Sequence, residues 1–329
     1  MEGIRYICIS LSVVLAVSFL LACSKVDEVL RQERIAQELN PETGMPKVSF
    51  GVEGLMFTEV ETKVDAVTSL SSFQASATYG TAGSETSKWN NVTFTSDGGS
   101  PATYSADKWW PTTDEHYHFY GSNNAITFSA AGSTVTAAGN TDTGAKDVVC
   151  AYRSYLAADY RTKVPLTFNH IYARIGQVQV TSKAPYAMTN VSLYLKNIKT
   201  GGVYNIRTGN GQTNGTGWTS KTPVSNTNKL IYSYAGSVAA GSSHTENNDI
   251  YVVPGDYYII ATWTATKDDY TQTFNSIDSS VGGHAISLVG GKINKITATL
   301  TGTATEITFS VIVTPWGSET VSYGEFPTS

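Results

Sequence analysis

Short runs in which apolar and polar residues alternate most constrain the fold of this chain. The first run, KVSFGVEGLMF from Lys47, places Val48, Phe50 and Val52 on one face of an extended segment. A period of two is typical of a strand that buries one face. Similar runs recur along the chain between Gly, Asn, Asp and Ser residues, without a long amphipathic helical pattern. The pattern therefore predicts an all-β fold of one or more sandwiches.

Composition and length agree with that prediction. Only 15% of the 329 residues are charged, and Thr, Tyr and Val, which favour strands, are frequent. A chain of this length suggests about two domains. The net charge of −5 is small and no basic cluster occurs, so nucleic acid is not an expected partner.

The N-terminal segment predicts export. Arg5 is the only cationic side chain ahead of an apolar run from Ile7 to Ala22. The run is shorter than the roughly 20 residues of a spanning helix and ends in small residues, as a secretory signal does. The sequence LLAC at its end is similar to a bacterial lipobox, so we expect residues 1–22 to be removed and Cys23 to be lipidated. An ordinary signal peptide with an incidental cysteine is the alternative.

Residues 23–45 are predicted to form a lipidated tether. They are rich in charge and their apolar stripe is thin, although a short helix over part of them is the alternative. With Cys8 removed and Cys23 acylated, Cys150 would have no cysteine partner. We therefore expect no intramolecular disulfide, and the core alone must stabilise the folded part.

The sequence carries no recognisable catalytic, metal or cofactor motif. No nucleophile elbow, zinc-protease helix or phosphate-binding loop is present, so we predict no enzyme and no cofactor. His116 and His118 would share a strand face that a metal could use, but a third ligand is lacking and we prefer solvent-facing or turn-side histidines. His170 lies in an apolar context and is expected near the core with a hydrogen-bond partner.

Four segments resemble, in order, the Bacteroidetes fimbrillin family, the subunits of type V pili and their accessory proteins. They are KWWPTTDEHYHFYGSN, KVPLTFNHIYARIGQVQVT, YVVPGDYYIIATWT and GGKINKITATLTGTATEITFSVIVTPW. The resemblance implies two tandem transthyretin-like antiparallel β-sandwich domains, which we place at residues 46–165 and 166–329. It also implies a precursor anchored by lipid at the cell outer membrane, exposed on the surface, and found in the fimbrium if processed.

The resemblance further implies that a trypsin-like protease cuts behind the first strand and that a neighbouring subunit fills the groove. Phe50 and Val52 would then lie in the removable strand, and Lys63 would be the matching cleavage residue. The family's stalk subunits commonly carry Arg there, so a stalk, tip or anchor role stays open. Cleavage at Arg31 or Arg34 would free the protein from lipid without opening a groove.

Two further features leave alternatives open. The stretch from Ile307 to Val313 is equally compatible with a donated strand and with a strand that completes its own sandwich. Trp109, Trp110 and Trp218 are candidate binding residues, and the Trp pair before Pro111 should face opposite sides, with one anchoring the core.

The expected partners are other pilus subunits, identical or accessory. The alternative function is a surface lipoprotein that binds host glycan or host protein without polymerising.

Overall fold

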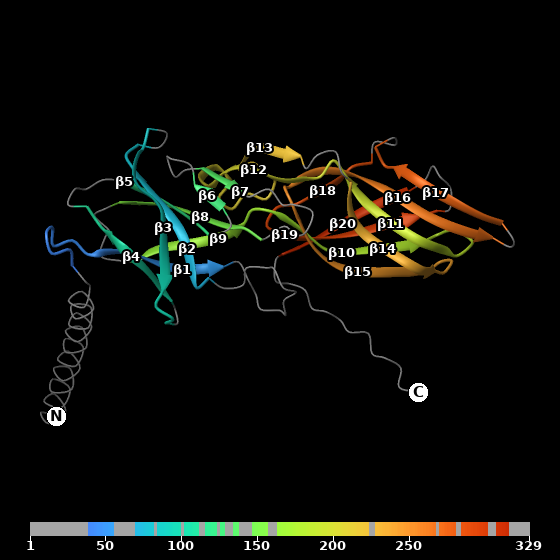
Figure 1. The fold of residues 1–329 in the computed structure, drawn as a ribbon, viewed down its shortest axis with the longest axis horizontal. Helices are drawn as coiled ribbons and strands as arrows, with labels where there is room; N and C mark the ends of the chain where they lie inside the picture. Colours follow the sequence, from blue (N-terminus) through green and yellow to red (C-terminus); the bar gives the residue numbers. More distant parts are fainter. Residues whose placement is uncertain are drawn as a thin grey trace, which may run out of the picture.

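The computed structural model describes residues 39–55, 70–81, 84–99, 102–111, 116–123, 126–128, 134–137, 147–156, 163–223, 228–267, 270–280, 284–301 and 307–315. Nearly all of these residues lie in strands or the turns between them. Figure 1 shows two bodies along the long axis of the molecule, a barrel and a sandwich, with short strands between them.

Seven strands of the N-terminal part close into a barrel. Their order around the barrel is β1 (Lys47–Leu55), β4 (Thr103–Trp109), β3 (Thr86–Ser96), β2 (Ser72–Tyr79), β5 (His116–Ser122), β8 (Val149–Leu156) and β9 (Val164–His170). Their inward side chains form one apolar core that is rich in phenylalanine. The alternating pattern explains this core, because every second side chain of a strand points to the same face.

Two sheets of the C-terminal part pack as a sandwich around a second core. One sheet has the order β15 (Ser243–Val252), β10 (Ala173–Ser182), β19 (Lys292–Leu300) and β20 (Ile307–Pro315). The other has the order β14 (Lys229–Val238), β11 (Met188–Lys196), β16 (Gly255–Lys267) and β17 (Tyr270–Asp278), with β18 (Ile286–Leu288) paired to β16.

A small sheet joins the barrel to the sandwich. It contains β6 (Ile126–Phe128), β7 (Thr134–Ala137), β12 (Lys199–Asn205) and β13 (Trp218–Pro223), and β12 leads into the short helix α2 (Ile206–Gly209). Strand β7 lies in the chain between two barrel strands, and it pairs with β12, which follows a sandwich strand. A third apolar cluster contains residues of both bodies, including Tyr120, Tyr172 and Tyr251, so the joint is a packed interface.

The predicted all-β fold is confirmed, but purely antiparallel pairing is wrong at two places. Strand β1 runs parallel to β9, and β10 runs parallel to β19. Each parallel pair joins strands far apart in the sequence, which leaves enough chain for the crossover that parallel strands need. Strand β9 is a barrel strand, so the barrel extends to His170, five residues past the predicted boundary. Within the described ranges no helix is long and apolar enough to cross a membrane.

Candidate functional site

Strand β1 closes the barrel because it lies between β4 and β9. It pairs antiparallel with β4, where Phe50 lies opposite Tyr104, and parallel with β9, where Phe50 lies opposite Val164. Both backbone edges of this nine-residue strand are therefore used. If β1 left the barrel, β4 and β9 would each lose a row of backbone hydrogen bonds and the core would open.

Phe50 anchors β1 in the centre of the barrel. Its ring is fully buried and meets three other rings edge to face, with centroids 4.7 Å from Phe94, 5.2 Å from Phe119 and 5.7 Å from Phe73. Such geometry is favourable for aromatic pairs. Val48 is also buried, whereas Val52 is half-buried. The predicted strand thus has the inward face that its sequence indicated, and it fills a row of apolar sites.

The first residue of β1 is held on the outer surface of the barrel. The Lys47 ammonium nitrogen lies 2.9 Å from a carboxylate oxygen of Asp107 and 5.1 Å from the centre of the Trp109 ring. Asp107 and Trp109 lie two residues apart on β4, so their side chains share one face. Trp109 is half-buried, and the Lys47 side chain of β1 lies over its ring.

The other two candidate tryptophans are not exposed platforms. Trp110 is buried in the barrel core, where it packs against Tyr117 and Phe119, so it is the anchoring member of the Trp pair. Trp218 is buried at the joint, and its indole N–H donates to the carbonyl of Ile171 at 3.2 Å. Both rings are buried, so neither offers an exposed surface in this structure.

Strand β20 lies at the edge of the sandwich. Among the described strands it pairs with β19 alone, from Leu300 opposite Ile307 to Lys292 opposite Pro315. Phe309 and Val311 pack against the sandwich core, whereas Ile312 is 60% exposed. In this structure β20 therefore completes its own sandwich and leaves one backbone edge unpaired among the described strands.

The sequences of β1 and β20 follow the same apolar pattern. Residues 48–52 read VSFGV and residues 307–311 read ITFSV, with a central phenylalanine and β-branched residues two positions to either side. Each segment carries a small or hydroxylated residue at the intervening positions. The apolar side chains of β20 are therefore similar to those that β1 places between β4 and β9.

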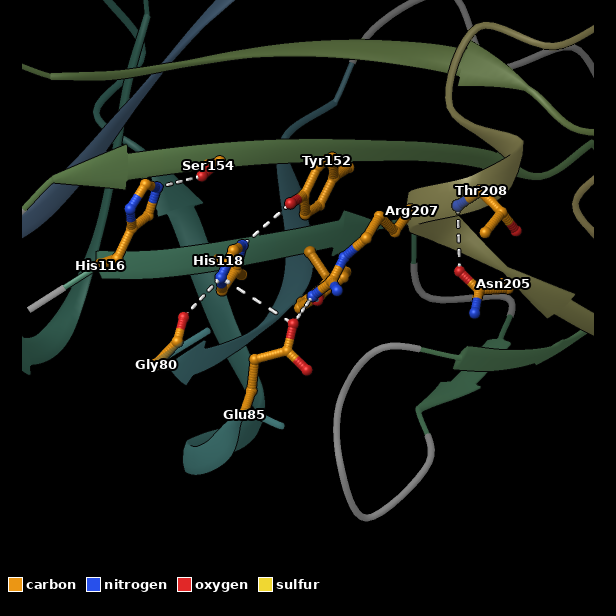
Figure 2. Close-up of polar contacts among 10 residues, drawn as sticks. Gly80, Glu85, His116, His118, Tyr152, Ser154, Asn205, Arg207 and Thr208 are labelled. Carbon is orange, nitrogen blue, oxygen red and sulfur yellow. Dashed lines mark hydrogen bonds and ion pairs between the residues drawn. The ribbon is translucent and has the colours of Figure 1, made fainter. Parts of the chain in front are cut away.

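A polar group that we call the junction cluster ties α2 to the barrel (Figure 2). Its members are Glu85, His118, Tyr120, Tyr152 and Arg207. The Arg207 guanidinium binds the carboxylate of Glu85 and the hydroxyl of Tyr120, and it lies over the rings of Tyr120 and Tyr152, with centroids 5.6 and 5.3 Å away. The Arg207–Glu85 ion pair is mostly covered, with side chains 22% and 11% exposed.

His118 lies beside this ion pair, with its Nε2 atom 3.9 Å from a carboxylate oxygen of Glu85 (Figure 2). Its Nε2 atom is 3.0 Å from the carbonyl of Gly80 and its Nδ1 atom is 2.9 Å from the Tyr152 hydroxyl (Figure 2). A carbonyl only accepts, so Nε2 carries the proton and Nδ1 accepts from Tyr152. Burial lowers the pKa of His118. The preference for a solvent-facing His118 is wrong because Glu85 and Arg207 cover this face, and no described group of three ligands suits a metal.

Two further buried groups lie near the joint. His170 has the expected partner, since its Nδ1 atom is 2.8 Å from a carboxylate oxygen of buried Asp147. Cys150 is buried and free, and burial raises the pKa of its thiol. The predicted lipidation residue Cys23 and the predicted cleavage residues Arg31, Arg34 and Lys63 lie outside the described residues.

Sequence reasoning missed Asp107, Glu85 and Arg207. Asp107 could have been found from its spacing to Trp109 once a strand was assigned there, because residues two apart share a face. Glu85 and Arg207 are 122 residues apart, and neither lies in a recognisable motif. Only the packing of α2 on the barrel brings them together.

The fold and this site define an all-β protein in which strand β1 closes a barrel between β4 and β9. A profile of the fimbrillin-like family matches residues 60–316, and the chain belongs to this family. Membership of this family supports a fimbrial role.

The chain is also similar to several solved structures. A fimbrial protein from Bacteroides vulgatus is 14% identical, with a TM-score of 0.49, covering 74% of this chain and 92% of that one. A proposed cell adhesion protein from Bacteroides uniformis is 14% identical, with a TM-score of 0.48, covering 84% and 100%. A fimbrial assembly protein from Parabacteroides distasonis is 10% identical, with a TM-score of 0.32, covering 74% and 91%. No curated protein matches the chain.

Proposed function

We propose that this protein is a structural or adhesive subunit of a type V pilus that assembles by strand exchange. In this proposal a protease releases β1, and a strand of a neighbouring subunit takes its place between β4 and β9. Membership of the fimbrillin-like family supports the pilus assignment. The observation that carries the exchange step is the position of β1, which closes the barrel and buries Phe50 at its centre.

The physical basis is strand addition to an open sheet edge. Loss of β1 would expose backbone donors and acceptors on two strands together with the apolar sites of Val48 and Phe50. Such a groove binds an extended segment through main-chain hydrogen bonds, and its side-chain pockets set the register. Binding also restores the buried apolar area, so the opened barrel favours capture of a new strand.

Strand β20 of another copy has a suitable pattern for this groove. Phe309 would enter the site of Phe50, and Val311 would enter the site of Val52. Ser310 would replace Gly51, where an added Cβ would lie 3.9 Å from its nearest contact, the Cβ of Lys163, so the small side chain fits. The sequence pattern of β20 and the space at Gly51 thus both permit β20 to take the place of β1.

Export and processing complete the proposal. Cys23 would carry the lipid at the outer membrane, and cleavage at Lys63 would release β1, whereas cleavage at Arg31 or Arg34 would release only the tether. N-terminal sequencing of protein shed from cells separates these routes, because the mature chain would start at Cys23, Gln32, Ile35 or Val64.

The decisive experiment follows assembly of the purified precursor after limited trypsin treatment. We expect trimming near Lys63 and ladders of oligomers that resist mild SDS, with Lys63→Ala as the matched uncleaved control. A second variant, Phe309→Ser, should be cleaved normally but assemble poorly, since it removes the central side chain of the donated strand. Defined cleavage that leaves only monomers would rule out polymerisation of identical copies through β20.

The alternative function is a surface lipoprotein that binds host glycan or host protein without polymerising. Of the three tryptophans proposed as platforms, Trp109 alone is partly exposed, and Lys47 already covers its ring. A glycan array with the intact precursor tests this alternative, and binding that Trp109→Ala abolishes would support it.

A further inference from the structure

We infer that the groove of β1 selects an incoming strand that carries a cation three residues before its buried aromatic residue. The groove would therefore prefer a partner subunit with Lys or Arg at that position over β20 of an identical copy. This inference rests on the proposed strand exchange and names the chemistry of the partner. It is carried by the contacts of Lys47 at the outer end of the groove.

The receiving site consists of Asp107 and Trp109 on β4. Lys47 lies directly opposite Trp109 in the strand register, so any segment that enters in the register of β1 presents its residue to the same two groups. The ammonium of Lys47 is 2.9 Å from the Asp107 carboxylate and 5.1 Å from the Trp109 ring centre. The Lys47 side chain is only 22% exposed, so most of it is shielded from water at this site.

Both receiving groups favour positive charge. The face of an indole ring carries a negative partial charge and attracts an ammonium or guanidinium group. Asp107 is 90% exposed, so water weakens its ion pair, and the partly covered indole adds a contact that water screens less. An apolar or neutral residue would lose both attractions, and an anion would meet like charge and the negative ring face.

The residue that precedes β20 in the sequence is an anion, and in an identical copy it would fall at this site. When Phe309 takes the place of Phe50 and Val311 that of Val52, Glu306 falls at the position of Lys47. A slip of two residues would relieve this mismatch, but it would move Phe309 out of the central aromatic site. The groove thus matches the apolar pattern of β20 but repels Glu306 ahead of it, and a repulsive contact of this kind gives specificity.

The test uses the full chain with a site-specific protease sequence in place of residues 60–66. After cleavage and release of β1 in mild denaturant, acetylated peptides compete for the groove with a fluorescent peptide of residues 46–55. The competitors are the unlabelled 46–55 peptide, its Lys47→Glu form, the 305–314 peptide and its Glu306→Lys form. We expect each lysine form to compete roughly tenfold better than the glutamate form of the same peptide.

A charge reversal in the groove supplies the matched control. Asp107→Lys changes an exposed side chain outside the core, and it should remove the preference for lysine or reverse it in favour of glutamate. Equal competition by both forms in the unaltered groove would overturn the charge selection but leave strand exchange in place. If even the unaltered 46–55 peptide fails to bind the opened chain, the proposed exchange fails with it.

Discussion

The ring of Phe50 on β1 meets the ring of Phe94 on β3 edge to face, with centroids 4.7 Å apart across the centre of the barrel. These strands are not neighbours in the barrel, so the contact holds β1 through its side chain as well as through its backbone. The strand that the proposed function removes is therefore well bound before cleavage. Its retention depends on an apolar site that another aromatic residue can fill.

Replacement of Phe50 should strongly destabilise the barrel. Phe50→Ala removes a fully buried ring and leaves a cavity, so we expect a loss of about 3–5 kcal/mol in the free energy of unfolding. Val52→Ala, at a half-buried position of the same strand, is the control and should cost about 1 kcal/mol. Urea denaturation followed by tryptophan fluorescence measures both. Similar losses for the two variants would contradict the central role of Phe50.

Cys150 should be inert while the protein is folded. Its thiol is buried, and the thiolate that reacts with alkylating reagents is disfavoured because burial raises its pKa. A chain that starts at Ser24 contains Cys150 as its sole cysteine, so labelling reports on this residue alone. We expect no iodoacetamide adduct by mass spectrometry in the native chain and complete labelling after denaturation. Rapid labelling of the native chain would show that the joint opens readily.

The inward face of β1 could be predicted from sequence because burial imposes a period of two on VSFGV. The same rule placed Trp109 and Trp110 on opposite sides. It could not show that β1 pairs with β9, because the period fixes the face of a strand but not its neighbours. The burial of Trp218 likewise depends on a hairpin packing over the chain at Ile171. Long-range contacts of this kind leave no local signal in a single sequence.

The Arg207–Glu85 pair should stabilise the junction between α2 and the barrel. Both side chains are mostly covered, so their interaction is screened less than that of a surface pair. We expect a double-mutant cycle with Glu85→Gln and Arg207→Met to give a coupling of about 1–2 kcal/mol in the free energy of unfolding. Urea denaturation of the unaltered protein, the two single variants and the double variant at one pH provides the four free energies of unfolding. Additive losses would mean that the two residues stabilise the junction independently.

Protonation of His118 should weaken the protein at acidic pH. Burial lowers the pKa of His118 in the folded state, so the unfolded chain takes up a proton at a higher pH than the folded chain does. The stabilisation is therefore complete above the unfolded pKa of about 6.5 and is lost as the pH falls towards the folded pKa. One such group changes the free energy of unfolding by at most about 1.4 kcal/mol per pH unit.

Unfolding at pH 7.5 and 5.5 tests this prediction with His118→Gln as the comparison. Glutamine can still donate to the Gly80 carbonyl and accept from Tyr152, but it does not titrate. The unaltered chain should lose more stability between the two pH values than the variant loses, and the difference measures the contribution of His118. If both chains lose the same amount, other groups control the acid sensitivity. The result matters for assembly because β5 carries His118 on its outer face and Phe119, which contacts Phe50 of β1, on its inner face.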